Sequence, residues 1–202
     1  MTRVVDPQTR VLRLARRKAV FRLSEATAEG VHPEAVRRMT RQGPLTRLGR
    51  GLYALPTIEP SEHHTLALIA KRAPHATFCL LTALRFHGLG TAHPREVWLA
   101  VDRRAGIPQI DVAPVRVVRL SGAALRGGAD VHTIEGVPVR ITSPARTVVD
   151  SFKFRNKIGI DVAVEALKEY RRSRKGSSDD LWREADHLRM AKIIRPYWDG
   201  IA

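Results

Sequence analysis

The chain has 202 residues, of which 44% are hydrophobic and 27% charged, a composition typical of globular proteins with one or two domains. Its 35 Lys and Arg against 20 Asp and Glu give a formal net charge of +15, which favours a polyanionic partner, either nucleic acid or an anionic membrane surface. The single cysteine, Cys79, excludes an internal disulfide and a cysteine-rich zinc site, and without a secretory signal or an apolar run of transmembrane length we expect a cytoplasmic, nucleoid-associated protein.

The positive charge is concentrated at the N-terminus. Residues 1–56 hold 12 Lys and Arg against 4 Asp and Glu, whereas the much longer remainder holds 23 against 16. Two prolines, Pro56 and Pro60, bracket a short polar stretch that is typical of a linker. We therefore predict a small basic binding domain at 1–56 and a larger, more balanced domain at 57–202.

The N-terminal domain is predicted to contain three helices. Apolar residues recur at helical spacing over 11–21, and arginines fill much of the remaining surface of this helix. Two of them, Arg16 and Arg17, are candidate DNA-binding residues. Ser24 is the expected N-cap of a short second helix that ends before Gly30, and Pro33 begins a third that Gly43 stops.

The third helix has two faces of opposite character. Val36 and Met39 fall on one side, and the other side carries four charged residues, Glu34, Arg37, Arg38 and Arg41. A helix of this kind can pack on a core through its apolar side and present arginines to a DNA major groove. Glu34 could accept a hydrogen bond from cytosine, or tether Arg38 one turn further on.

A β-hairpin with a cationic tip is predicted after the third helix. Alternating residues flank the tip Gly49-Arg50-Gly51, and Arg47 lies on its first strand. The order of helices and hairpin is that of a winged helix-turn-helix, in which Arg47 and Arg50 would contact phosphates. A membrane-surface helix is the weaker interpretation, because the apolar faces lack the large side chains of interfacial anchors.

The remainder is predicted to be an α+β domain with a small, mostly antiparallel sheet. Alternating residues indicate strands at 95–101, 113–120, 131–134 and 137–142, and helical periodicity indicates helices at 61–73, 77–89, 144–155, 159–172 and 181–194. Arg146 and Asp150 are spaced for an intrahelical ion pair. The cations Arg171, Arg172, Arg174 and Lys175 are either a second phosphate-binding group or a solvated loop.

A catalytic or metal site finds little support in the sequence. A nuclease would need carboxylates that converge on a divalent ion, with a lysine close by. Glu96, Asp102 and Asp111 lie on or beside predicted strands, but no Glu-x-Lys pattern follows them. The eight histidines lack metal-ligand spacing, so we predict neither a metal nor another cofactor.

Three segments resemble the AbiEi-type antitoxins, which are transcriptional regulators of type IV toxin–antitoxin and phage-defence operons. They are RLGRGLYAL at 47–55, FCLLTALRFHGL with HPREVWLAV at 78–101, and the long stretch from ITSPARTVVD to EALKEYRR at 141–172. The last is the most specific, and the resemblance extends from Val11 to Arg172. The dipeptide His32-Pro33 is a departure, since a small hydroxyl residue is expected as the N-cap there.

The resemblance implies a winged DNA-binding domain and a C-terminal antitoxin domain. Such a protein would repress its own operon by binding inverted repeats in the promoter, and would counter a nucleotidyltransferase-like toxin with or without direct contact. DNA contacts would carry over to Arg37, Arg38 and Arg41 on the third helix and to Arg47 and Arg50 in the hairpin. The alternatives are a stand-alone DNA-binding regulator and a DNA-binding nuclease.

Overall fold

The computed structural model describes residues 6–57, 60–121, 124–125 and 127–201, so Ile58 and Glu59 of the predicted linker lie outside the described residues. The chain divides into two compact units. The first comprises residues 1–74, 108–112 and 132–139, and the second comprises the remaining segments. The first unit thus extends beyond residue 56, and it also contains the tip of a hairpin from the C-terminal half.

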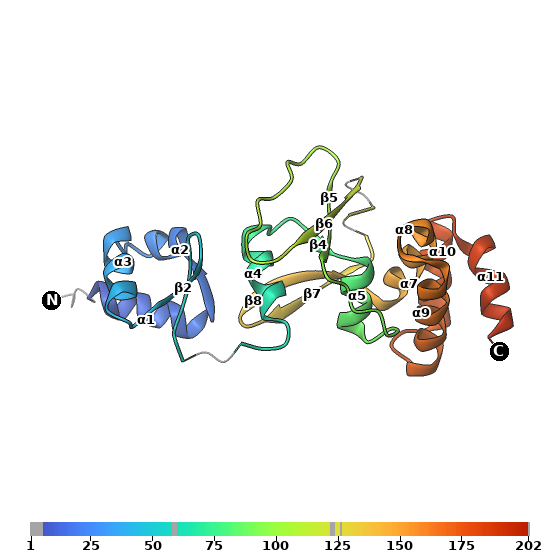
Figure 1. Ribbon diagram of the computed structural model, residues 1–202, viewed down its shortest axis with the longest axis horizontal. Coiled ribbons are helices and arrows are strands. Elements are labelled where there is room, and N and C mark those ends of the chain that lie inside the picture. Colours follow the sequence, from blue (N-terminus) through green and yellow to red (C-terminus); the bar gives the residue numbers. More distant parts are fainter. Residues whose placement is uncertain (1–5, 58–59, 122–123, 126, 202) are drawn as a thin grey trace. The chain divides into compact units, whose positions relative to one another are not determined.

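The N-terminal part of the first unit is a winged helix-turn-helix (Figure 1). Its helices are α1 (Pro7–Arg17), α2 (Leu23–Ala28) and α3 (Pro33–Arg41), and its strands are β1 (Val20–Arg22), β2 (Thr46–Gly49) and β3 (Leu52–Ala54). The strands form an antiparallel sheet in the order β1-β3-β2. Strands β2 and β3 are the predicted hairpin, which we call the wing, and their register shifts between Arg47 and Gly49.

Two details of this part differ from the sequence prediction. The first helix ends at Arg17, and residues expected to continue it form β1, which pairs with β3 from Val20 opposite Ala54 to Arg22 opposite Leu52. The second helix begins at Leu23 after the cap residue Arg22, so Ser24 lies inside the helix and is not its cap. The backbone N–H of Arg22 instead donates a hydrogen bond to a carboxylate oxygen of Glu25 at 2.6 Å.

An apolar core fixes α1, α2 and α3 to the sheet. It contains buried side chains from each of these elements and from the segments between them: Val11, Leu14, Ala15, Phe21, Ala26, Val31, Ala35, Val36, Met39, Leu45 and Tyr53. Val36 and Met39 supply the buried side of α3, as its periodicity predicts. Burial of a side chain the size of Val or Met stabilises the fold by roughly 1.5–3 kcal/mol. These two anchors therefore leave the opposite side of α3 facing solvent.

Helix α4 (His64–Arg72) also belongs to the first unit. We expected this helix to begin at Ser61, but its N-cap is His63. The backbone N–H and hydroxyl of Ser61 both donate to Glu135 at 2.8 Å, and His64 Nδ1 lies 2.7 Å from the other oxygen of that carboxylate. Because Glu135 satisfies the polar groups of Ser61, the start of the helix shifts toward His64.

A five-stranded sheet has the order β6-β5-β4-β8-β7. Its strands are β4 (Thr77–Phe78), β5 (Val97–Asp102), β6 (Val115–Leu120), β7 (Ala129–Ile134) and β8 (Val137–Thr142). The β4–β5 pair is antiparallel, whereas β4–β8 and β5–β6 are parallel. The domain is α+β as predicted, but its sheet is mixed and not mostly antiparallel, because short β4 lies between strands that run in opposite directions.

The helices of the second unit are α5 (Leu80–His87), α7 (Pro144–Lys153), α8 (Arg155–Ile158), α9 (Ile160–Ser173), α10 (Ser178–His187) and α11 (Ala191–Gly200). Figure 1 shows α7 to α11 packed together at one side of the sheet. Their core is centred on Val148, Val149 and Phe152 of α7. The predicted final helix is in fact α10 and α11, since Arg189 between them adopts the left-handed conformation at φ 58°.

Candidate nucleic-acid interface

The solvent-facing side of α3 carries one carboxylate and three guanidinium groups. We call this set, Glu34, Arg37, Arg38 and Arg41, the charged face of α3. Its side chains are exposed, with fractions of 61% for Arg37, 71% for Arg41 and 50% for Glu34. The structure therefore places these residues together on one accessible surface, opposite the buried Val36 and Met39.

Glu34 binds two of the three arginines. Its Oε2 lies 3.3 Å from Arg37 Nη1, and its Oε1 accepts from Arg41 Nη2. The sequence-based alternative that Glu34 tethers Arg38 is wrong, because both carboxylate oxygens are directed to the neighbouring positions. Among the residues that the structure describes, the side chain of Arg38 has no hydrogen bond or ion pair, so its guanidinium donors are available to a ligand.

The N-terminus of α3 is capped by an imidazole. The backbone N–H of Glu34 donates to Nδ1 of His32 at 3.2 Å, and Pro33 occupies the first helical position, where no N–H is needed. His32 thus replaces the small hydroxyl residue that the family resemblance led us to expect at this position. The start of α3 is fixed with Pro33 and Glu34 in its first turn.

The wing presents the exposed side chains of Arg47 and Arg50. Arg47 Nε donates to the carbonyl of Gly49 at 3.2 Å, within the same hairpin. Gly49 also lies against Arg72 of α4, because a Cβ at this position would meet the Arg72 guanidinium at 2.8 Å. Arg72 in turn pairs with Asp111 at 3.1 Å, so residues outside the predicted domain support the backbone of the wing.

Helix α1 contributes further exposed arginines. Arg17 pairs with Glu29, which follows α2, and Arg10 donates to the carbonyl of the same residue at 3.4 Å. Arg16 is exposed, and its side chain forms no hydrogen bond or ion pair with any described residue. In the N-terminal part, the exposed predicted contacts without a described partner are therefore Arg16, Arg38 and Arg50.

A partly buried ionic cluster behind α2 was not predicted from the sequence. Glu25 accepts from Lys18 at 2.5 Å and from Lys71 of α4 at 2.9 Å. Burial acts to raise the pKa of Glu25, but hydrogen bonds from Lys18, Lys71 and the Arg22 backbone outweigh it and lower the pKa to about 2. This cluster joins α2, the helix that precedes α3 in the motif, to α4.

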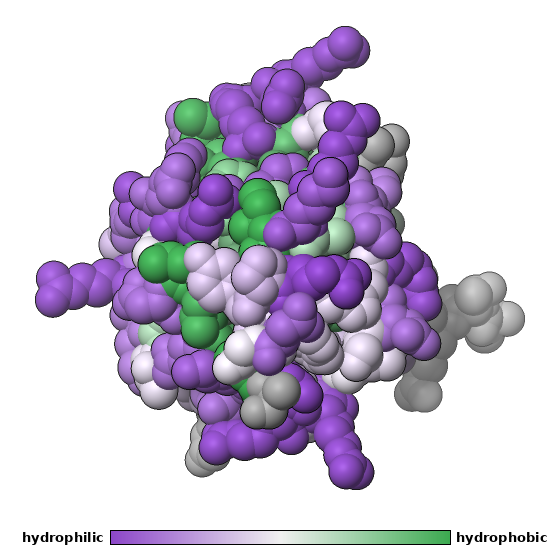
Figure 2. All heavy atoms as spheres, turned by 90° about the vertical axis from the view of Figure 1, so that its right-hand side faces the viewer, coloured by the Kyte–Doolittle hydropathy of each residue, from purple (hydrophilic) through white to green (hydrophobic). Residues whose placement is uncertain are grey.

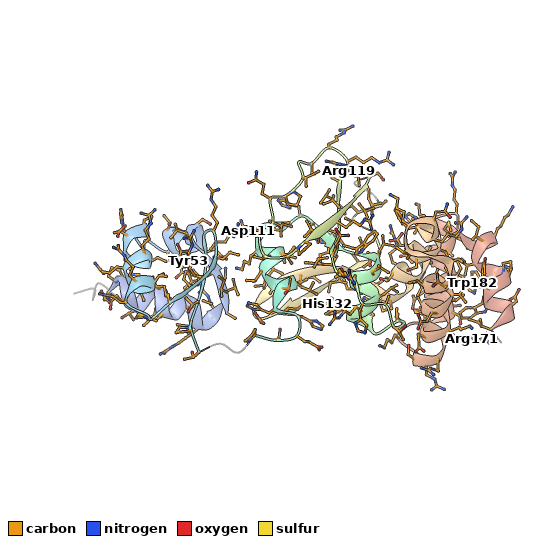
Figure 3. All side chains as sticks on the ribbon, in the orientation of Figure 1. Tyr53, Asp111, Arg119, His132, Arg171 and Trp182 are labelled. Atoms are coloured by element: carbon orange, nitrogen blue, oxygen red, sulfur yellow. The ribbon has the colours of Figure 1, made fainter. Side chains whose placement is uncertain are left out.

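Most of the basic cluster at 171–175 is engaged within the protein. Arg171 lies over the Trp198 ring and donates to its carbonyl, Arg172 pairs with Glu169, and Lys175 donates to the carbonyl of His87. Figure 3 places Arg171 and Trp182 among the C-terminal helices, and Figure 2 shows that face as mostly hydrophilic with small hydrophobic patches. These contacts favour the structural interpretation of the cluster over a second phosphate-binding group.

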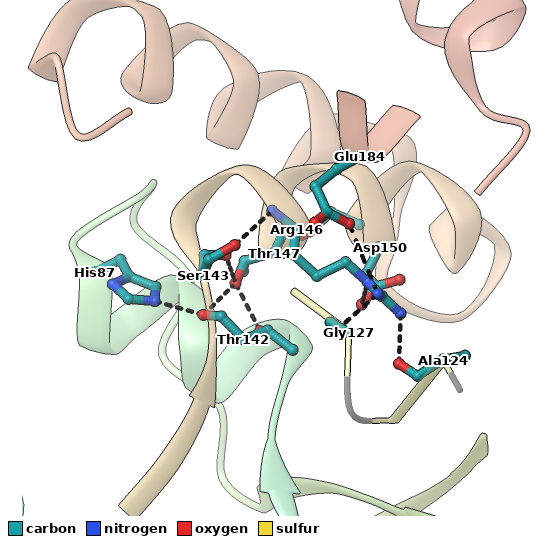
Figure 4. A network of polar contacts seen from close by, with 10 residues as sticks. His87, Ala124, Gly127, Thr142, Ser143, Arg146, Thr147, Asp150 and Glu184 are labelled. Carbon is teal, nitrogen blue, oxygen red and sulfur yellow. Dashed lines mark hydrogen bonds and ion pairs between the residues drawn. The ribbon is translucent and has the colours of Figure 1, made fainter. Parts of the chain in front are cut away.

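A buried polar network centres on Arg146, whose side chain is 1% exposed (Figure 4). Its Nε donates to Asp150 at 2.8 Å, confirming the predicted intrahelical pair. The other guanidinium nitrogens donate to the carbonyls of Gly127 and Ala124 at 3.1 Å each. Arg146 therefore fixes the loop before β7 to α7, a role that its sequence spacing alone does not reveal.

The carboxylates considered for a nuclease do not converge. Glu96 precedes β5 and Asp102 ends it, which separates them by roughly 20 Å of extended strand. Asp111 is bound to Arg72. Across the described residues, no group of three or more His, Cys, Asp or Glu side chains is arranged to hold a metal ion. The described helices include none that combines the length and apolarity needed to cross a bilayer.

Comparison with family models gives two matches that together cover most of the chain. Residues 10–56 match the family described as transcriptional regulator, AbiEi antitoxin, and residues 76–195 match the AbiEi antitoxin C-terminal domain. The chain belongs to the AbiEi antitoxin family. It is therefore an antitoxin of the transcriptional-regulator type. The first matched segment lies within the first unit, whereas the second includes residues of both units, since 108–112 and 132–139 belong to the first.

A solved structure has a similar fold to this AbiEi chain. The RV2827C protein from Mycobacterium tuberculosis superimposes with a TM-score of 0.59 at 18% sequence identity, covering 89% of this chain and 71% of that one. At this level of identity the similarity concerns the fold alone. No curated protein sequence matches the chain.

Proposed function

We propose that this AbiEi protein is a sequence-specific DNA-binding autorepressor that also serves as the antitoxin of its own type IV toxin–antitoxin operon. In this account Arg37, Arg38 and Arg41 enter the major groove of an inverted repeat, and Arg16, Arg17, Arg47 and Arg50 contact phosphates. The protein acts in the cytoplasm, on DNA and on a nucleotidyltransferase-like toxin, without a catalytic step of its own.

The observation that carries the DNA-binding part is the placement of the charged face of α3. Its guanidinium groups lie on the exposed side of a helix whose opposite side is held by the buried Val36 and Met39. A helix-turn-helix of this type places its second helix in the major groove. The wing beside it carries two more exposed arginines, which suit the flanking phosphates.

The DNA-binding part is tested by footprinting the purified protein on the DNA upstream of its own gene. We expect protection of two half-sites related by inverted repetition, and loss of that protection when Arg37, Arg38 and Arg41 are all replaced by alanine. Circular dichroism of the triple variant checks that it is folded. Uniform protection along the whole fragment would instead indicate non-specific binding.

The antitoxin part is tested by expression of the neighbouring toxin-like gene in a host cell. Co-expression of the full chain should restore growth, and it should do so even when the charged face of α3 is replaced, because antitoxin activity is assigned to the second domain. Growth that is never restored would remove the antitoxin role and leave a stand-alone regulator. DNA cleavage that depends on an added divalent metal would favour a nuclease.

A further inference from the structure

The carboxylate of Glu34 lies in the middle of a surface that is otherwise cationic. Glu34 is the only acidic residue of α3, and it occupies the first turn of that helix. In helix-turn-helix proteins the N-terminal residues of this helix contact base edges. A half-exposed carboxylate at that position would approach the phosphates of any duplex and be repelled by them, so its presence there calls for a compensating interaction.

The ion pairs of Glu34 limit how the face can bind a duplex non-specifically. Arg37 and Arg41 both share its charge, so of the three guanidinium groups only Arg38 is without a partner among the described residues. For Arg37 and Arg41 to contact phosphates, they must leave Glu34. That exchange leaves the carboxylate close to DNA without a donor, unless a base supplies one.

Cytosine is the base whose chemistry fits this requirement. It presents an amino donor, N4–H2, in the major groove without the N7 acceptor that lies beside the amino donor of adenine, whereas guanine presents only acceptors there. Contact between a carboxylate and the major-groove edge of cytosine is therefore favourable, whereas the same contact with guanine is repulsive. With a cytosine N4–H2 as donor, Glu34 can accept from DNA while Arg37 and Arg41 remain beside it in the positions that the structure shows.

We propose that Glu34 is a specificity-determining residue that selects cytosine and lowers the affinity of the protein for unrelated DNA. This inference rests on the proposed DNA-binding function and deepens it. It predicts two opposite effects of the same side chain. Glu34 raises the affinity for sites that place cytosine beside it and lowers the affinity for all other sequences. A carboxylate that only supported the helix would give no preference for a base. Its replacement would also not raise the affinity for random DNA while lowering the affinity for the selected sequence.

The test uses the full-length protein and a library of random duplexes, from which bound sequences are selected. The Glu34→Gln variant keeps the shape of the side chain but adds an amide donor, and glutamine pairs with adenine in the major groove. We expect one position of each half-site to change from cytosine to adenine. The ratio of affinities for the wild-type sequence and a shuffled duplex should fall about tenfold.

Affinity of Glu34→Gln for the shuffled duplex should rise at the same time, because Arg37 and Arg41 become free for phosphates. Each additional phosphate contact steepens the slope of log K against log[salt] by about 0.9. Glu29→Gln is the matched control, since it frees Arg17 in the same way but lies outside α3. The control should raise both affinities alike and leave the selected sequence unchanged.

Three outcomes would separate the possibilities. Selection of the same sequence by wild type and Glu34→Gln, with the same affinity ratio, would overturn the role of Glu34 while leaving sequence-specific binding intact. Equal loss of affinity for both duplexes by a folded variant would overturn it as well. Failure of the wild type to select any sequence would instead contradict the proposed function itself.

Discussion

Arg38 differs from its two neighbours on α3 in having no partner among the described residues, so it can bind DNA without first breaking an ion pair. We predict that Arg38→Ala lowers affinity for the selected duplex by about 1–3 kcal/mol, as expected for loss of a bidentate contact to guanine, with a smaller effect on shuffled DNA. Fluorescence anisotropy titrations of both duplexes provide the measurement. Equal losses of affinity for the selected and the shuffled duplex would indicate that Arg38 contacts a phosphate and not a base.

Glu25 should make the stability of the protein depend on pH in the acid range. Its pKa is about 2 in the folded protein, against 4.5 for the free side chain. The stabilisation is therefore complete above pH 4.5 and is lost as the pH falls toward 2. Glu25→Gln should lower the free energy of unfolding at neutral pH by about 1–3 kcal/mol, because Lys71 loses a charged partner.

Denaturant unfolding at several pH values measures this effect. The difference between the wild type and Glu25→Gln should shrink as the pH falls below 4.5. Glu29→Gln is the control, because Glu29 pairs with the exposed Arg17 and should contribute little. Parallel stability curves for the wild type and Glu25→Gln would show that the cluster does not control acid stability.

The sequence predicts on which side of a helix the functional side chains lie. It predicts less well which residues form hydrogen bonds or ion pairs with them. Helical periodicity alone places Arg37 and Arg41 opposite Met39, and the structure agrees. It does not reveal that Glu34 reaches Arg41 seven residues away, because that contact depends on side-chain conformation. The Glu25–Lys71 contact joins residues 46 positions apart, and no local pattern encodes such a pair.

At the scale of elements, the differences from prediction occur where tertiary contacts override local preference. Strand β1 has three residues and is defined by its pairing with β3, so its sequence alone continues the pattern of α1. The break between α10 and α11 falls at Arg189, a residue type with good helix propensity, and the buried Met190 follows it. By contrast, α7 begins at Pro144, the first residue of the helix predicted at 144–155, and Ser143 is its N-cap.

The buried Arg146–Asp150 pair offers a test at this scale. Arg146→Ala should destabilise the protein by about 3–5 kcal/mol, since it leaves the Asp150 carboxylate buried without its cation. Replacing both residues together, as Arg146→Met with Asp150→Leu, should recover part of that loss because no charge remains unpaired in the pair. Denaturant unfolding gives both values, and a double variant less stable than the single one would contradict this reasoning.

For the whole molecule, the net charge of +15 overstates the cations available to DNA. Some of them are already engaged by partners on the protein surface, as are Arg171, Arg172 and Lys175 in the cluster at 171–175. If about six phosphates are contacted, log K should fall with log[salt] with a slope near −5, and Arg50→Ala should reduce that slope by about 0.9 on every duplex. A slope near −10 would require a much larger contact surface than the first unit supplies.

The unique cysteine makes a direct measurement of the DNA-facing surface possible. Cys79 is buried, and burial raises the pKa of its thiol, so an introduced surface cysteine can be labelled selectively with a DNA-cleaving iron chelate. The exposed residues Gln42, which follows α3, and Lys168 on α9 provide two attachment sites, as Gln42→Cys and Lys168→Cys.

Cleavage of the upstream duplex by each labelled variant would report which surface lies in the groove. Our account predicts strong cleavage within each half-site from position 42, centred on the bases nearest α3, and weak or diffuse cleavage from position 168. Strong, localised cleavage from position 168 with none from position 42 would contradict the assignment of α3 as the DNA-reading helix.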